Sequence, residues 1–160
     1  MMGVGKTTIA KIVSKKLNLK LIDTDLNIEK KLSMKISEIF LRKGEFFFRS
    51  VEEKEVLESI KKTNCIIALG GGAFLNKLVR EKILKNSISI WLDINLKTLN
   101  KRIKWSKKRP LLKVENIQEK INKLYAERKK IYKLAKHRIN CTDSDKKNIA
   151  KKIIDIYDKQ

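Results

Sequence analysis

The sequence has few cysteines and no long hydrophobic run, and each shortage excludes a class of protein. Cys65 and Cys141 are the two cysteines in 160 residues. Each stands beside an apolar, strand-like run, which is typical of a reduced, buried thiol in a cytoplasmic protein; a disulfide or a metal site is the alternative. No apolar run approaches the roughly 18–20 residues of a membrane-spanning helix, so we expect no membrane partner.

Acidic residues are also scarce, with 18 Asp and Glu against 39 Lys and Arg and a net charge of +21. This excess predicts salt-sensitive sticking to polyanions. The basic residues are mostly lysines, scattered along every predicted helix, and no aromatic-rich RNA-binding signature accompanies them. The pattern therefore favours lysine-rich, solvated helix faces over a specific nucleic-acid surface.

The chain has the length of one domain and alternates between two kinds of apolar pattern. Short apolar runs predict strands at 19–22, 65–69, 87–94 and 137–141. Helical periodicity marks 7–17, 26–60 with a break near Lys43-Gly44, 75–84, 96–103, 116–135 and 145–157. Such alternation predicts βαβ units and a parallel sheet covered on both faces.

The first chemical motif is Gly3-Val4-Gly5-Lys6-Thr7, the second half of a phosphate-binding P-loop. In such loops backbone N–H groups at a helix N-terminus hold phosphate oxygens, the Lys reaches the β/γ-phosphates and the Thr hydroxyl binds Mg²⁺. The amphipathic helix that follows strengthens this interpretation. The first Gly of the full pattern would stand one position before Met1.

Two carboxylates, Asp23 and Asp25, come just after the first predicted strand. The carboxyl ends of parallel strands are where ligands bind in open sheets. There the pair could serve Mg²⁺ through water and accept a proton from a substrate hydroxyl. The alternative is helix capping by Asp25 or Thr24.

Two arginines have patterns that suggest an anionic ligand. Arg128 occupies an inward-facing position of its helix, where a guanidinium needs an anionic partner. An internal salt bridge is the alternative. Arg49 follows three phenylalanines and precedes Glu52 and Glu53, so a helical ion pair explains it equally well.

Two loops complete the set of candidate residues. Gly70-Gly71-Gly72 directly follows a buried strand, and three glycines would let the backbone approach a ligand closely. Arg109, in the basic loop from 104 to 113, could close over phosphates as part of a lid, or could simply be solvated surface.

Together these motifs resemble the shikimate kinase family. The resemblance consists of six co-linear matches: G-V-G-K-T-T (3–8), L-I-D-T-D (21–25), I-S-E-I-F with G-E-F-F-F-R-S-V-E (36–40 and 44–52), A-L-G-G-G-A (68–73), R-P-L-L (109–112) and A-E-R-K-K-I-Y (126–132). It implies an α/β P-loop kinase fold, a three-layer sandwich with strand order 2-3-1-4-5, in one domain over 1–160. Residues 26–55 would form a helical substrate-binding subdomain and 104–116 a lid.

The resemblance also implies a reaction and a role for each candidate. The chain would be a cytoplasmic monomer that phosphorylates the 3-hydroxyl of shikimate with ATP and Mg²⁺, in aromatic amino-acid biosynthesis. Asp25 would be the base and would bind the shikimate hydroxyls. The remaining roles would be ATP binding by Gly3, Val4, Gly5, Lys6, Thr7, Thr8, Arg102 and Arg109, of which Lys6 and Arg109 would also be catalytic; metal binding by Thr7 and, through water, Asp23; and shikimate binding by Arg49, Gly70, Gly71, Gly72 and Arg128.

The first Gly of the P-loop pattern is not in the sequence, and other interpretations of the chain remain. The chain could be a non-catalytic remnant of such a kinase, or another small-molecule P-loop kinase such as a gluconate kinase. We expect about 8–15 further residues upstream, an apolar strand and then Gly-x. That strand would be the central one of the sheet, and without it two strand edges and a trench in the core would be exposed.

Overall fold

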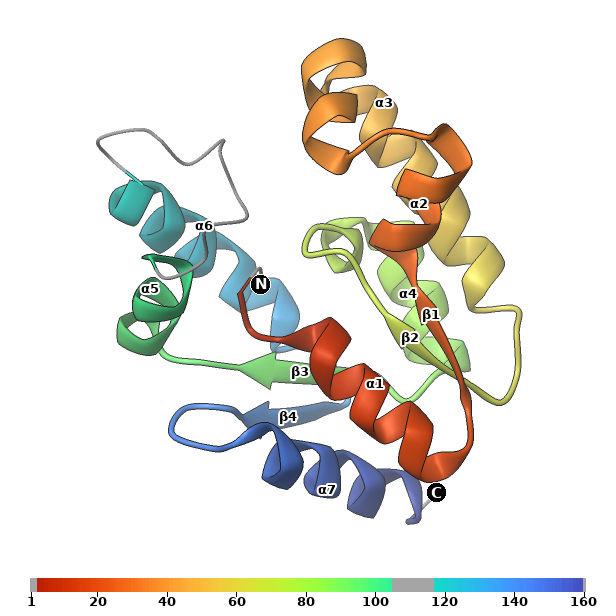
Figure 1. Ribbon diagram of the computed structural model, residues 1–160, viewed down its shortest axis with the longest axis vertical. Coiled ribbons are helices and arrows are strands. Elements are labelled where there is room, and N and C mark those ends of the chain that lie inside the picture. Colours follow the sequence, from red (N-terminus) through yellow and green to blue (C-terminus); the bar gives the residue numbers. More distant parts are fainter. Residues whose placement is uncertain (1–2, 105–116, 160) are drawn as a thin grey trace.

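The computed structural model describes residues 3–104 and 117–159 (Figure 1). Four short strands alternate with seven α-helices and one 3₁₀ turn in this part of the chain. Their bounds are α1 Lys6–Leu17, β1 Lys20–Asp23, α2 Thr24–Leu32, α3 Ile36–Ser59, β2 Cys65–Ala68, η1 Ala73–Leu75, α4 Lys77–Asn86, β3 Ile90–Asp93, α5 Leu96–Lys104, α6 Ile117–Tyr132, β4 His137–Asn140 and α7 Lys146–Tyr157. The predicted alternation of helices and strands is confirmed.

The ends of the helices follow their local sequences. Asp23, Asn76 and Asp145 cap α2, α4 and α7 with side-chain oxygens that accept backbone N–H bonds. The cap of α2 is therefore neither Asp25 nor Thr24, the two residues suggested by the sequence. The predicted break at Gly44 is a kink within α3, where the backbone takes a φ of 81°. A second break, which was not predicted, falls at Ser33 with a φ of 50°.

The strands pair in parallel, as predicted, but in two separate sheets. β1 pairs with β2, and β3 pairs with β4. The expected order 2-3-1-4-5 counts the expected upstream strand as strand 1, so β1 to β4 correspond to its strands 2 to 5. The two observed pairs are then the pairs 2-3 and 4-5 at the ends of that order. No strand in the described residues joins β2 to β3, so the complete order stays a prediction. In Figure 1 helix α1 crosses in front of the space between the two sheets, and α7 runs below it.

Two hydrophobic cores hold the described residues together. The larger one joins both sheets to α1, α4, α6 and α7, and includes Ile9, Val13, Trp91 and Ile139. The smaller one lies between α2 and α3 around Ile28, Ile39 and Phe48. Helix α3 contributes to both cores: its first part packs against α2 at the carboxyl ends of β1 and β2 (Figure 1), whereas Val56 near its end belongs to the larger core.

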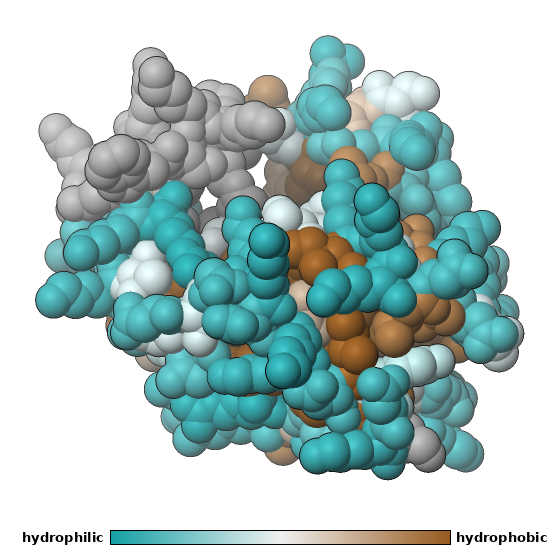
Figure 2. Space-filling view, turned by 60° about the horizontal axis from the view of Figure 1, so that its bottom comes forward, coloured by the Kyte–Doolittle hydropathy of each residue, from teal (hydrophilic) through white to brown (hydrophobic). Residues whose placement is uncertain are grey.

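The outer surface is mainly hydrophilic, but apolar residues reach it in the middle of the face shown in Figure 2. Both cysteines are free thiols. Burial raises the pKa of Cys141 to about 11, which keeps this thiol protonated and unreactive near neutral pH. Among the residues described, no helix combines the length and the apolar character that crossing a membrane would require.

Candidate functional site

The glycine-rich loop at the start of the chain leads directly into the N-terminus of α1. Gly3 and Gly5 have φ values of 77° and 94°, a left-handed conformation that side chains with a Cβ rarely adopt. Gly5 is the N-cap residue, and no side chain caps this helix end within the described part of the chain. The first turn also lacks an acidic residue. Its N–H groups and positive dipole are therefore suited to an anion such as a phosphate.

Asp23 and Thr7 form the second part of the site, beside the glycine loop. The Thr7 hydroxyl donates a hydrogen bond of 2.7 Å to Asp23 Oδ2. The other oxygen, Asp23 Oδ1, accepts from the backbone N–H of Leu26 at 3.2 Å. The pair offers two hard oxygen ligands next to the uncapped N-terminus of α1. This donor set fits Mg²⁺, which takes one or two protein oxygens and completes its octahedron with phosphate and water.

Thr24 links the carboxyl end of β1 to the triple-glycine loop. Its side chain is fully buried. Its hydroxyl donates to the carbonyl of Ala68 at 3.3 Å and accepts from the N–H of Gly70 at 3.0 Å. The start of α2 and the start of the glycine loop are therefore fixed to one another.

Two carboxylates approach the glycine loop from α2 and α3. A Cβ placed on Gly70 would lie 2.5 Å from Asp25 Oδ1 and 2.5 Å from Glu52 Oε1. This space is open only because residue 70 has no side chain. Asp25 and Glu52 therefore face the same point of the backbone, at the carboxyl end of β2.

Two guanidinium groups approach the next two glycines. Arg128 donates to the carbonyl of Gly71 at 3.3 Å, and a Cβ on Gly72 would collide with the guanidinium of Arg49. Arg49 also pairs with Glu52 at 2.6 Å and with Glu45 at 3.0 Å. Charges of both signs thus converge on three consecutive glycines. Of the two ion pairs suggested by the sequence for Arg49, Glu52 is confirmed, whereas Glu53 instead accepts from Asn76.

Tyr132 anchors the loop from the same helix face as Arg128. Its hydroxyl donates to the carbonyl of Gly71 at 2.5 Å. Burial raises the pKa of Tyr132, with the charges of Arg128 acting in the opposite direction. The phenol therefore stays protonated as a hydrogen-bond donor. Since Tyr132 lies one helical turn after Arg128, both side chains reach the same carbonyl.

Glu52 is buried and its pKa is raised, chiefly by desolvation. The bond and the charge of Arg49 act against this increase, the charge of Asp25 adds to it, and Arg128 acts weakly against it. All four charged side chains are therefore close enough to influence one another. Desolvation and the charge of Asp25 therefore outweigh the effect of the two arginines on the pKa of Glu52.

The raised pKa of Glu52 predicts a pH-dependent contribution to stability. The folded protein keeps this proton to a higher pH than the unfolded chain, whose ordinary value is 4.5. The contribution of Glu52 to the free energy of unfolding should therefore fall as the pH rises from 4.5 through the raised pKa. Urea unfolding of wild type and Glu52→Gln over this window should show wild type losing stability relative to the variant. Exposed Glu58→Gln is the control, and a relative gain by wild type would contradict the prediction.

The other predicted residues have less central positions. Arg102 donates to the carbonyl of Val4 at 3.4 Å, which places it against the glycine loop. Thr8 is exposed on the first turn of α1. Arg109 and the predicted lid at 105–116 lie outside the described residues. The structure thus brings together Lys6, Thr7, Asp23 and Arg102 around one loop, and Asp25, Arg49 and Arg128 around the other.

Three residues of the site were not assigned roles from the sequence. Thr24 had been considered only as a cap, Glu52 only as a helical ion-pair partner, and Tyr132 had no role. The available signals were positional: Thr24 lies between the two strand-end aspartates, and Tyr132 follows Arg128 by four residues.

A phosphate-type loop, a threonine–aspartate pair and paired arginines over a glycine loop define a P-loop kinase of a small anionic molecule. The family model described as shikimate kinase matches residues 2–158. A shikimate kinase of Sulfurihydrogenibium is 40% identical over 153 residues, which cover 96% of this chain and 91% of the relative. One from Bartonella henselae is 39% identical, with 96% and 73% covered. The chain therefore belongs to the shikimate kinase family, a family of ATP- and Mg²⁺-dependent kinases.

Solved structures agree with this assignment. Shikimate kinase from Acinetobacter baumannii, in complex with shikimate, has a TM-score of 0.90 at 30% identity and covers 98% of this chain and 88% of its own. The enzyme from Bacteroides thetaiotaomicron has a TM-score of 0.91 at 26% identity, covering 99% and 94%. The predicted fold class is thereby confirmed.

Proposed function

We propose that this chain transfers the γ-phosphoryl group of ATP to the 3-hydroxyl of shikimate, and that the residues gathered around its two glycine loops carry out the reaction. The observation that supports this most directly is the convergence of Asp25, Arg49 and Arg128 on Gly70–Gly72. A small molecule with one carboxylate and several hydroxyls matches this arrangement of two cationic groups and one anionic group.

The glycine loop before α1 would hold ATP. The backbone of Gly3–Gly5 and the N-terminus of α1 would bind the phosphates, and Lys6 would reach the β/γ-phosphates. Thr8, on the first turn of α1, and Arg102, which contacts Val4, would add to this site. Thr7 and Asp23 would hold Mg²⁺, Asp23 through water; when bound, the ion neutralises charge on the phosphates. Arg109 would complete the ATP site from the segment 104–116, as a lid.

The triple-glycine loop would hold shikimate. Arg49 and Arg128 donate to its carboxylate as planar, fork-shaped donors. Asp25 accepts hydrogen bonds from the hydroxyls and takes the proton of the attacking one. Gly70, Gly71 and Gly72 leave room for the ring. Catalysis of phosphoryl transfer then rests mainly on this positioning and on charge stabilisation.

The test is shikimate-dependent release of ADP by the full chain, with gluconate as the competing acceptor. We expect release with shikimate and none above background with gluconate. Release with gluconate alone would favour a different small-molecule kinase. Shikimate binding by calorimetry without ADP release would identify a non-catalytic member of the family.

Replacement of Gly70 by Ala should damage shikimate binding specifically. The new Cβ would meet Asp25 Oδ1 and Glu52 Oε1, each 2.5 Å away, so both carboxylates must move. We expect kcat/KM for shikimate to fall about 100-fold, the usual effect of a misplacement of about 1 Å. The KM for ATP should change little, since that loop is separate. Steady-state kinetics checks this, and a selective loss for ATP would contradict it.

The same proposal covers the organisation of the chain. We infer a single domain over 1–160, whose residues 26–55 form a helical subdomain for the substrate; the separate core around Ile28, Ile39 and Phe48 supports this. We also infer a cytoplasmic location, in keeping with the free thiols. We further infer a monomer without a nucleic-acid or membrane partner. Light scattering of the purified chain measures the oligomeric state.

A further inference from the structure

A buried carboxylate on α3, that of Glu55, ties this helix to α2. The residue is only 3% exposed. Its Oε1 accepts from the side-chain amide of Asn27 at 2.8 Å and from the hydroxyl of Ser59 at 3.4 Å. Its Oε2 accepts from the ammonium of Lys31 at 2.5 Å. Asn27 and Lys31 both belong to α2, one helical turn apart, so a single carboxylate holds that helix at two points.

Glu55 lies on the buried face of α3, where a carboxylate is stable only if hydrogen bonds replace its water. Burial raises the pKa of Glu55, but the bonds from Lys31 and Asn27 outweigh this effect and lower the pKa overall. Glu52, one turn earlier on the same buried face, has a raised pKa instead. The two buried carboxylates of α3 therefore differ: Glu55 is held in its ionised form by donors from α2, whereas Glu52 faces the triple-glycine loop.

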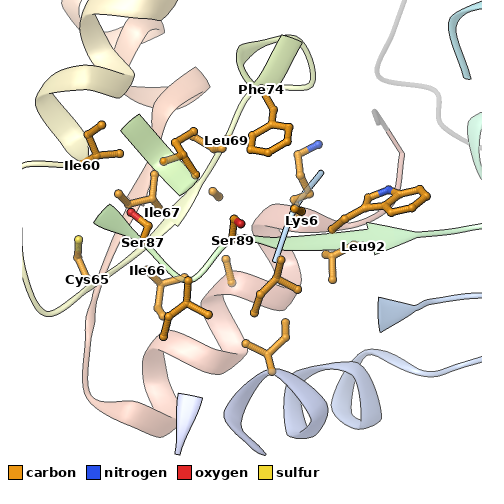
Figure 3. Close-up of a pocket in the computed structure, with 18 of the residues that line it drawn as sticks. Lys6, Ile60, Cys65, Ile66, Ile67, Leu69, Phe74, Ser87, Ser89 and Leu92 are labelled. Atoms are coloured by element: carbon orange, nitrogen blue, oxygen red, sulfur yellow. The ribbon is translucent and has the colours of Figure 1, made fainter. Parts of the chain in front are cut away.

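The second half of α3 is a fixed support for this contact. Val56 belongs to the larger core, and Ile60, which ends the helix, lines the same apolar cavity as Ile67 of β2 (Figure 3). Helix α2, in contrast, has nine residues and ends at the left-handed Ser33. A helix of this length is marginally stable without tertiary contacts. The position of α2 therefore depends on what holds it against α3 and the sheet.

Asp25 lies between two residues of α2 that are anchored to different parts of the structure. Immediately before it, Thr24 bonds to Ala68 and to the N–H of Gly70. Two positions after it, Asn27 bonds to Glu55. The first anchor places the start of α2 relative to the triple-glycine loop. The second anchor places it relative to α3.

We propose that Glu55 is a positioning residue of the kinase: by holding Asn27, it keeps Asp25 at the distance from α3 that the reaction requires. The proposal rests on the proposed function, in which Asp25 takes the proton of a substrate whose carboxylate is bound by Arg49 of α3. Glu55 acts on the reaction through Asn27 and α2. Lys31 contributes less to this positioning, because its side chain is 61% exposed and ion pairs with an exposed partner are weak.

Three variants separate the hydrogen bond to Asn27 from the charge of Glu55. Glu55→Ala removes both. Glu55→Gln removes the charge but keeps an oxygen that can accept from Asn27, and Asn27→Ala removes the donor but keeps the charge. Glu58→Ala is the matched control, because Glu58 lies on the same helix and its side chain is 65% exposed.

Two kinds of measurement are made on each variant. Steady-state kinetics gives kcat and the KM values for shikimate and ATP. Carboxyl NMR of the ligand-free protein gives the pKa of Glu52, which the charge of Asp25 raises and which therefore reports the distance between these two carboxylates. The thermal midpoint shows that each variant is folded at the assay temperature.

We expect kcat to fall about tenfold in Glu55→Ala and in Asn27→Ala, less than the roughly 100-fold effect of a displacement of about 1 Å. The double variant should lose no more than either single variant, because both changes break the same bond. Glu55→Gln and Glu58→Ala should keep kcat close to that of wild type, and the KM for ATP should stay unchanged throughout.

The pKa of Glu52 should be lower in Glu55→Ala than in Glu55→Gln. Both variants lack the charge at position 55, and only the alanine variant lets Asp25 move away. This comparison requires no turnover, so it still tests the positioning of Asp25 if the chain releases no ADP and the proposed function fails. Equal Glu52 pKa values in the two variants would overturn the proposal.

Two kinetic results would also overturn it. A kcat for Glu55→Gln as low as that of Glu55→Ala would mean that the charge, and not the bond to Asn27, supports the reaction. A lower thermal midpoint of Glu55→Ala with an unchanged kcat would mean that Glu55 stabilises the fold without positioning Asp25.

Discussion

Replacing Lys6 by Ala should reduce kcat for shikimate phosphorylation by about 10²–10³-fold, the usual effect of removing one preorganised donor at a developing charge. Lys6 is the first residue of α1 and follows its N-cap residue Gly5, so it stands at the helix N-terminus beside the glycine loop. In the wild-type protein the Lys6 ammonium would contact the β/γ-phosphates, where negative charge shifts during transfer. The alanine variant loses this contact. Steady-state kinetics with varied ATP and shikimate gives kcat and both KM values.

Lys11→Ala is the matched control, since Lys11 is exposed on the same helix and away from its N-terminus. It removes an equal charge from the same element and should leave kcat unchanged. Circular dichroism and the thermal midpoint should be similar for both variants and wild type. Equal losses in the two variants would mean that overall positive charge, and not the position of Lys6, supports activity.

Local sequence patterns were sufficient to predict the elements that position the site. Asp23 ends β1, Asp25 lies in the first turn of α2, and Gly70–Gly72 follow β2. Arg128 of α6 reaches the carbonyl of Gly71. The elements that carry these residues depend on residues near one another in the chain, where periodicity and turn chemistry act. The kink at Gly44 was predictable for the same reason, because glycine readily adopts a positive φ.

The features that sequence could not predict depend on contacts between distant residues. Thr24 bonds across 46 positions to Gly70, and Tyr132 bonds across 61 positions to Gly71. Ser33 adopts a left-handed φ, although glycine and asparagine are the residues whose presence usually predicts that conformation. Glu52 has the sequence pattern of an ordinary helical ion pair, and its burial beside Asp25 appears only once α2 and α3 are packed.

The position of Asp25 allows a second strong prediction. It lies at the start of α2, within reach of the carboxyl end of β2, and faces the Gly70 backbone beside Glu52. The charge of Asp25 raises the pKa of Glu52. Two carboxylates in one small site compete for a proton. Because Glu52 is buried and paired with Arg49, Asp25 is the carboxylate better placed to act as the base.

We therefore expect Asp25→Asn to lower kcat by about 10²–10⁴-fold, the range for loss of a general base. The amide keeps the shape of the side chain and can still bond a hydroxyl, so the KM for shikimate should change far less. Loss of the Asp25 charge should also shift the Glu52 pKa downward, detectable by carboxyl NMR. Exposed Asp155→Asn is the control. A large rise in KM with an unchanged kcat would show that Asp25 binds shikimate without taking its proton.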